Sequence, residues 1–397
     1  MGLLRSLFAL VIFFFLFGEV IRIPISGLSI KLIDIGVAIL AFYWVLFIVN
    51  NKKKIRIDKR LSTPILIFFA VALLSLIFNA MFLKSDELFV SALYLIRWIA
   101  YASIAFIIPM FNSSFKKKIK NMLVLVGIFV VVLGYIQYFL YPNLRNLYYL
   151  GWDEHLFRMF SVFLDPNFAG AFFVLYFLFL LNLIFKNSKN NKLQLIYCAL
   201  AMPTLISVFL TYSRSALIML TVGIVVFLIM KKKSVYILSV ILVFTGITFI
   251  LPKAYKTEGT NFLRITSSEA RIGSAKQALG LFWDNPVFGV GFNTYRYAKN
   301  RHGFTFGNWE ESHADAGTDN SFLFILATTG VTGFVTYLFM WFKILKINAR
   351  SKVLIASIVA LFVDSLFINS LFYSFLMFWI WSLVGLLSAD RQVTESK

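Results

Sequence analysis

The run FAGAFFVLYFLFLLNLIF, residues 168–185, contains eighteen residues and no charged side chain. A helix of about 20 apolar residues crosses the ~30 Å hydrocarbon core of a bilayer while satisfying its own backbone hydrogen bonds. Similar runs recur along the chain of 397 residues, of which 60% are hydrophobic and 14% charged. Soluble domains hold about 45–50% apolar and about 25% charged residues. The sequence therefore predicts an all-α, polytopic membrane protein rather than a soluble domain.

The apolar runs define about twelve candidate transmembrane helices. They cover residues 4–20, 29–49, 62–82, 88–110, 121–141, 168–185, 193–211, 214–230, 234–251, 319–342, 353–369 and 371–388. Two connectors, 211–214 and 369–371, are very short, and residues 353–388 also fit one re-entrant pair. Lysine-rich loops occur in every second connection. Because cytoplasmic loops carry the excess of Lys and Arg, we expect both termini in the cytoplasm.

The formal net charge of +20 does not indicate nucleic-acid binding, because the lysines cluster in the short loops between apolar runs. That pattern suits membrane topology and attraction to anionic lipid. The single cysteine, Cys198, excludes an intramolecular disulfide and a cysteine-based metal site. Arg5 followed by an apolar run without a small-residue cleavage site predicts a first membrane helix rather than a removed signal peptide.

One long polar segment, residues 252–318, interrupts this pattern. With cytoplasmic termini it becomes a large extracytoplasmic loop within a single membrane domain, 1–397. The capping-box pattern at Thr266–Glu269 starts a helix, and Asn285-Pro286 ends it. Its apolar residues follow helical spacing, which predicts a short amphipathic helix on the outer leaflet: Ile272, Ala275, Leu279 and Phe282. The run Gly289-Val290-Gly291 predicts a tight, closely packed turn.

The cations expected outside the cytoplasm are largely arginines, and the planar guanidinium binds phosphate or carboxylate in a bidentate manner. Positive charge on this side opposes the topology rule and calls for another cause. Arg296 and Arg301 are explained simply if they balance the seven acids around the loop. The remaining candidates for an anionic, diphosphate-bearing substrate are Arg158, Arg214, Arg264 and Arg271.

Charged residues within apolar runs usually mark a site or a fixed partner, because burying them in lipid is costly. Arg97 and Asp364 lie in the middle of predicted spans, and Asp34 lies near the start of another. Three alternatives stay open from sequence: an Arg97–Asp364 pair, an Arg97–Asp34 pair, or contacts with substrate. At this level an arginine-lined enzyme and a transporter fit the chain equally well.

Four motifs together resemble the O-antigen ligase and Wzy-type polysaccharide polymerase superfamily. They are RMFSVFLDPNFAGAFF (158–173), TYSRSALIML (211–220), Arg271 followed by WDNPVFGVGFNTY (283–295), and DNSFLFILATTGVTGF (319–334). The resemblance covers roughly residues 158–340 and rests on the order of the motifs and the long loop between the last two. It implies a bacterial inner-membrane glycosyltransferase of about twelve helices with a large extracytoplasmic loop.

The resemblance further implies an inverting, metal-independent reaction without cofactor on a glycan carried by undecaprenyl diphosphate. Arg214 and Arg271 match the arginines that bind the diphosphate in this family. A loop histidine is the proposed general base and immediately precedes the Asn that opens the next helix, but here Asp319 occupies that position. His313 stands six residues earlier. Either His313 or Asp319 is therefore expected to be the catalytic base.

The functional prediction is a polymerase of lipid-linked repeat units in O-antigen, capsule or exopolysaccharide synthesis. The alternative within the family is an O-antigen ligase that transfers polymer to lipid A core, and the alternative of another class is a lipid-linked oligosaccharide transporter. A cell-shape type peptidoglycan polymerase fits the loop pattern less well. Expected partners are the lipid-linked glycan, membrane lipid, and a flippase and chain-length regulator, with no nucleic acid.

Overall fold

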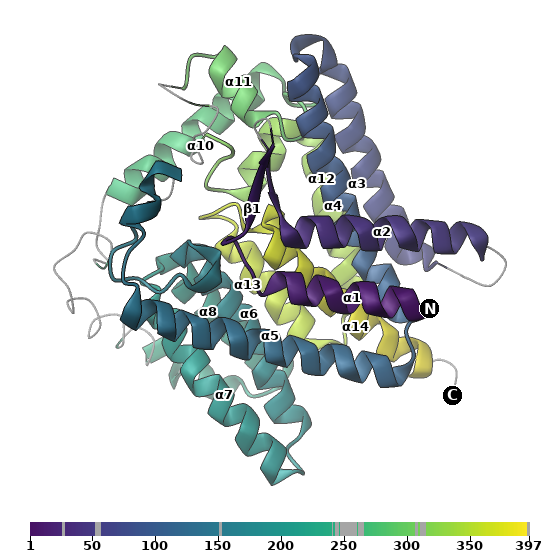
Figure 1. Ribbon diagram of the computed structural model, residues 1–397, viewed down its shortest axis with the longest axis vertical. Helices are drawn as coiled ribbons and strands as arrows, with labels where there is room; N and C mark the ends of the chain where they lie inside the picture. The colour runs from purple at the N-terminus through teal and green to yellow at the C-terminus, as the bar shows by residue number, and fades with distance from the viewer. Residues whose placement is uncertain are drawn as a thin grey trace.

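The computed structural model describes residues 1–25, 28–51, 57–150, 153–239, 241–242, 246, 260, 266–305, 309 and 315–394. Helices build nearly all of this part of the chain (Figure 1). The first half contains α1 (Gly2–Phe15), α2 (Leu32–Asn50), α3 (Lys59–Phe78), α4 (Ser85–Ile107), α5 (Ser113–Leu140) and α6 (Pro166–Lys186). The second contains α7 (Asn191–Leu210), α8 (Arg214–Met230), α10 (Thr266–Asp284), α11 (Tyr295–Arg301), α12 (Ser321–Ile347), α13 (Lys352–Asp364) and α14 (Ser374–Thr394).

Within the described residues, seven helices are long and apolar enough to cross a membrane, judged by length and composition: α2 to α7 and α12. Shorter apolar helices are α1, α8 and most of α14. The prediction of an all-α polytopic membrane protein is thus confirmed, while the count of twelve spans is not. The predicted span 234–251 lies largely outside the described residues. The breaks expected at 211–214 and 369–371 are present, since α8 follows α7 and α14 follows α13 as separate helices.

A small hairpin is the exception to the all-α prediction. Strands β1 (Arg22–Ile25) and β2 (Leu28–Lys31) pair antiparallel, with Arg22 opposite Lys31. The hairpin projects from the connection between α1 and α2 into the middle of the molecule (Figure 1). It is fixed there because the backbone N–H of Glu19 donates to the carbonyl of Val162 at 2.8 Å.

Helix α6, built from the apolar run 168–185, is buried over most of its length. It contacts α7, α8 and α13, and its aromatic rings pack against α14, as in the edge-on pair of Phe172 and Trp379 with centroids 5.1 Å apart. A helix that is apolar on all sides is expected to be buried on all sides. The core therefore lies around α6, and the N-terminus of α6 is held rigidly.

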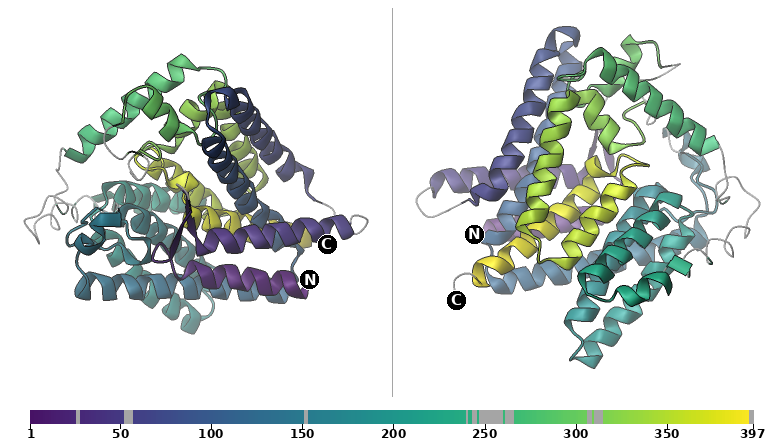
Figure 2. Two further views of the ribbon diagram at one scale, coloured as in Figure 1. Left: turned by 45° about the horizontal axis from the view of Figure 1, so that its top comes forward. Right: turned by 180° about the vertical axis from the view of Figure 1, so that it is seen from behind.

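The glycine-rich turn after α10 docks on a break in α12. The backbone of Gly330 is non-helical, with φ +65°, and frees carbonyls that accept from Val290 and Gly291 N–H, both at 3.0 Å. Gly289 has φ +65°, and a Cβ there would lie 2.5 Å from the Thr328 carbonyl carbon. The predicted tight turn is confirmed. It positions α10, which extends from the end of α12 toward the side of the molecule formed by α5 to α8 (Figures 1 and 2).

Candidate functional site

The N-termini of α6 and α8 meet and form the floor of the candidate site. Asp165 caps α6, and its carboxylate accepts from the backbone N–H of Asn167 at 2.6 Å. Ser213 caps α8, and its hydroxyl donates to the Asn167 side-chain oxygen at 2.9 Å. The helices approach closely because Gly170 lacks a side chain; a Cβ there would lie 2.6 Å from that of Ala216. The motifs 158–173 and 211–220 are thereby joined.

Arg158 is buried and ties this floor together. Its Nε donates to the carbonyl of Thr211 at 2.8 Å, and one terminal nitrogen lies 3.4 Å from the side-chain oxygen of Asn167. These contacts hold the turn between α7 and α8 in place, so Arg158 has a positioning role in the structure. Direct contact between Arg158 and a diphosphate stays a prediction.

Arg214 is the first residue of α8 and is half-buried. The N-terminus of a helix carries a partial positive charge and unsatisfied N–H groups, which favours anions. Arg271, which is half-buried on α10, lies close enough for the two like charges to interact. The structure thus brings together the two arginines that the sequence motifs singled out, from elements far apart in the chain.

Helix α10 begins at Thr266 and ends at Asp284, as the capping pattern and Asn285-Pro286 predict. The side that packs on the protein carries Ala278 and Leu281, whereas Ile272 and Leu279 are 57% and 38% exposed. Because Ala275 and Phe282 are half-buried, only part of the predicted apolar stripe faces outward. Its contact with the outer leaflet remains a prediction.

Ser274 on α10 positions the end of the long loop. Its hydroxyl donates to the side-chain oxygen of Thr318 at 3.0 Å, and the backbone N–H of Asp319 donates to the same Ser274 hydroxyl at 3.4 Å. The backbone of Asp319 is thereby held at Ser274, which lies one helical turn after Arg271 on α10. This arrangement places the carboxylate of Asp319 near the guanidinium group of Arg271, which in turn lies near that of Arg214.

Asp319 is exposed at the surface, yet the protein around it desolvates the carboxylate and raises its pKa, an effect that the charge of Arg271 partly opposes. Asp319 does not cap α12, because the neighbouring Asn320 does. The Asn320 side-chain oxygen accepts from the N–H groups of Phe322 and Leu323 at 2.9 and 3.0 Å. The carboxylate of Asp319 is thus not committed to the helix end, and a raised pKa makes it a stronger base than an ordinary aspartate.

Two of the predicted site residues, His313 and Arg264, lie outside the described residues, so their roles stay predictions. Among the residues that are described, no group of three His, Cys, Asp or Glu side chains is placed to hold a metal ion. The second loop histidine, His302, pairs instead with Asp284, with 3.0 Å between Nε2 and Oδ2.

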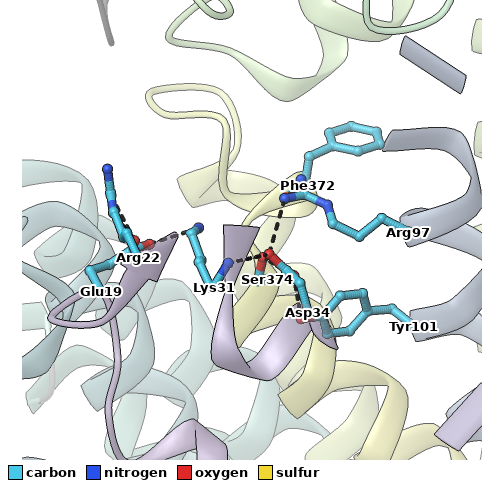
Figure 3. A network of polar contacts seen from close by, with 8 residues as sticks. All are labelled: Glu19, Arg22, Lys31, Asp34, Arg97, Tyr101, Phe372 and Ser374. Atoms are coloured by element: carbon cyan, nitrogen blue, oxygen red, sulfur yellow. Dashed lines mark hydrogen bonds and ion pairs between the residues drawn. The ribbon is translucent and has the colours of Figure 1, made fainter. Parts of the chain in front are cut away.

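Of the three charged residues within apolar runs, Arg97 and Asp34 pair with each other, whereas Asp364 lies apart from them near the candidate site. Arg97 pairs with Asp34, with 3.6 Å between Nη1 and Oδ2 (Figure 3), so this alternative is confirmed and the Arg97–Asp364 pair is not. Asp364 is fully buried at the end of α13 and has no hydrogen bond within 3.5 Å in the described structure. It lies beside the hydroxyls of Ser215 and Ser370 and feels the charge of Arg271.

Asp364, the α6 capping residue Asp165 and its neighbour Asn167 are site residues that the sequence reasoning did not assign. The signals were present: Asp364 is a charge within an apolar run, and Asp165-Pro166-Asn167 lies inside one of the quoted motifs. That these residues lie near Arg214 could be seen only in the folded structure.

Residues 199–338 match the model of the family described as O-antigen ligase. The match covers 140 of the 397 residues, and this segment is similar to that family. The match contains Arg214, Arg271 and Asp319, together with the turn that docks α10 on α12, and it confirms the resemblance indicated by the motifs. It places the protein among membrane enzymes of glycan assembly. No curated protein matches the sequence.

Proposed function

We propose that this protein is a glycosyltransferase of the bacterial cytoplasmic membrane that acts, on its outer side, on glycans carried by undecaprenyl diphosphate. The observation that carries the proposal is the approach of Arg214 and Arg271 beside Asp319. Two like charges held together in a partly desolvated place cost free energy. A diphosphate removes that cost and matches the bidentate geometry of two guanidinium groups.

In the proposed reaction, the acceptor sugar hydroxyl attacks the anomeric carbon of the donor glycan. The base, Asp319 or His313, takes the hydroxyl proton as the new C–O bond forms. The bond from the anomeric carbon to the diphosphate oxygen breaks with inversion, and the lipid diphosphate leaves with its electron pair. Arg214 and Arg271 stabilise the negative charge that develops on the leaving group. Arg158 and the hydroxyl of Ser213 keep the α8 end that carries Arg214 in position.

We assign the acceptor to a second lipid-linked repeat unit, which makes the enzyme a polymerase of O-antigen, capsule or exopolysaccharide. The position of Asp319, where the family pattern has histidine, favours this assignment. The second candidate is an O-antigen ligase with lipid A core as acceptor, and the description of the matching family favours it. Both reactions use the same donor and the same arginines.

Deletion of the gene followed by gel analysis of surface polysaccharide tests the proposal. Loss of the chain-length ladder with one repeat unit retained supports the polymerase. Free polymer together with uncapped lipid A core identifies a ligase. An unchanged glycan profile contradicts both reactions. Complementation with an Arg271→Ala variant, which should not restore the wild-type profile, connects the result to this site.

A further inference from the structure

A second cationic cluster surrounds the hairpin, away from Arg214 and Arg271, and its centre is Glu19. One oxygen of the Glu19 carboxylate accepts from the Arg22 guanidinium at 2.6–2.7 Å, and the other lies 2.7 Å from the Lys31 ammonium (Figure 3). Glu19 is 2% exposed. One carboxylate is therefore shared by two cations that face each other across β1 and β2.

The cluster continues from the hairpin to α4 through Asp34. One Asp34 oxygen accepts from the hydroxyls of Tyr101 and Ser374 at 2.7 and 2.8 Å, and the other lies 3.6 Å from Arg97 (Figure 3). Arg97 also donates to the carbonyl of Phe372 at 3.3 Å. Its Nε is buried and has no hydrogen-bond partner in the described structure. We call Glu19, Arg22, Lys31, Asp34 and Arg97 the hairpin network.

The hairpin network contains three cations and two carboxylates, a sum of +1 over these five residues. The signs are also segregated by exposure. The side chains of Arg22, Arg97 and Lys31 are 21%, 20% and 11% exposed, whereas those of Glu19 and Asp34 are 1% and 8% exposed. The carboxylates lie inside and the accessible edges are cationic, so an approaching solute meets positive charge.

A purely structural ion pair does not require this stoichiometry. Lys31 alone neutralises Glu19, and adding Arg22 places a further partly buried charge next to Lys31. Burial and the charges of Arg97 and Arg22 lower the pKa of Lys31, while Glu19 and Asp34 oppose that shift. Two partly buried cations that share one carboxylate repel each other, and an anion bound at the exposed edge reduces that repulsion.

The hairpin network is in contact with the candidate site through two aromatic rings. The Lys31 ammonium lies 4.6 Å from the ring centre of Tyr373. The Tyr373 ring stacks on Phe168 with centroids 3.9 Å apart. Phe168 belongs to the first turn of α6, next to Asn167 and its bond to Ser213. The stacked rings of Tyr373 and Phe168 therefore lie between the hairpin network and the α8 end that carries Arg214.

We propose that the hairpin network is a second anion site, which binds the diphosphate of the acceptor lipid while Arg214 and Arg271 bind that of the donor. This inference rests on the proposed function, because polymerisation joins two glycans that each carry a lipid diphosphate. A ligase acting on lipid A core does not need a second site of this chemistry. The hairpin network is thus the feature of the fold that specifies the acceptor.

The stoichiometry of lipid binding tests this inference directly. Native mass spectrometry of the purified full chain in detergent, with added undecaprenyl diphosphate, counts the bound lipids. The wild type is expected to bind two, Arg22→Gln one and Arg214→Gln one. Arg22→Lys, which keeps the charge but loses the planar fork, is expected to bind the second lipid about tenfold more weakly than wild type. Arg145→Gln is the matched control, because Arg145 is an exposed arginine paired with Glu154 outside both sites, and it should bind two.

One bound lipid in the wild type, or two in Arg22→Gln, overturns the inference. Equal displacement of the second lipid by phosphatidylglycerol also overturns it, because the site then recognises any anionic headgroup. If Arg22→Gln does not fold, Arg97→Lys keeps the ion pair with Asp34 while removing the planar fork, and second-site binding should weaken about tenfold. If the wild type binds one lipid and Arg214→Gln binds none, the second site is wrong but the proposed function stands. If the wild type binds no lipid and deletion of the gene leaves the glycan profile unchanged, the proposed function itself is contradicted.

Discussion

The site around Arg214 and Arg271 and the hairpin network both gather cations near the hairpin side of α6, yet they balance charge differently. In the hairpin network every cation faces a carboxylate within 4 Å. At the candidate site Arg271 forms no ion pair within the described residues, and its charge interacts with that of Arg214. Removing a cation from the hairpin network should therefore lower the stability of the fold, whereas removing one from the candidate site should lower only the rate of glycan transfer.

The largest expected effect is on catalysis at the site of Arg214 and Arg271, where Arg271 forms no ion pair within the described residues. Arg271→Ala should lower the rate of glycan transfer by about 10²–10³-fold, the usual loss for one group that stabilises developing negative charge. The midpoint of thermal unfolding in detergent should stay unchanged. Arg145→Gln serves as the control. Wild-type transfer by Arg271→Ala, measured with a purified lipid-linked donor, contradicts the assignment.

The opposite pattern is expected in the hairpin network. Arg97→Gln leaves Asp34 without its cation and should destabilise the protein by about 3 kcal/mol, the range found when one partner of a buried pair is removed. Thermal unfolding in detergent measures the loss. Arg97→Lys is the conservative companion and should retain most of the stability. An unchanged midpoint for Arg97→Gln removes the distinction between the two regions.

A third variant tests whether the turn that docks α10 on α12 holds Arg271 in the candidate site. Gly289→Ala forces an alanine to φ +65° with its Cβ 2.5 Å from the α12 backbone, at a cost of about 2 kcal/mol. Because this turn anchors α10, transfer activity should fall along with stability. Gly303→Ala is a control, since Gly303 has φ +69° but no atom within 4 Å of the added Cβ. Equal behaviour of the two variants shows that docking on α12 is unimportant.

The smallest expected effect concerns Asp319. Its folded-state pKa is raised, so the ionised carboxylate disfavours the fold as pH rises above the unfolded value of about 3.9. Asp319→Asn should therefore unfold at a slightly higher temperature than wild type at pH 7, and the difference should vanish toward pH 4. Unfolding curves over this pH range measure it. A lower midpoint for Asp319→Asn at pH 7 contradicts the raised pKa.

The same variant addresses the base. If Asp319 is the base, activity should be lost in Asp319→Asn, and wild-type activity should decline on acidification at a higher pH than for an ordinary aspartate. If His313 is the base, His313→Ala should abolish transfer while Asp319→Asn retains it. Full activity in both variants excludes both residues as the base.

The sequence predicts the helices well where apolar length alone decides them. Helices α6 and α8 begin and end within two residues of the expected limits 168–185 and 214–230. The end of α10 follows from Asn285-Pro286 because proline cannot continue a helix. The hairpin was missed because its strands are short: β1 lies in the connector between the expected spans 4–20 and 29–49, and most of β2 lies inside the second span. The polarity of Arg22–Lys31 nevertheless alternates around Ser26-Gly27.

The site divides in the same way. Arg214 and Arg271 were found from their motifs, but the partner of Arg97 was not. Sequence spacing cannot choose among the three alternatives, and only the fold places α2 beside α4. The role of Arg158 in holding the turn between α7 and α8 depends on contacts 53 residues apart in the chain. Sequence therefore indicates which charges matter, while tertiary contacts decide what each one does.

In the proposed reaction, one enzyme joins two lipid-linked glycans, and its Arg214 and Arg271 stabilise the leaving diphosphate. Purified protein in proteoliposomes, supplied with undecaprenyl-diphosphate-linked repeat units and no lipid A core, tests it most directly by gel analysis of the products. We expect a ladder of chain lengths with the wild type and none with the Arg214→Ala or Arg271→Ala variant. No ladder with the wild type until lipid A core is added contradicts the polymerase assignment.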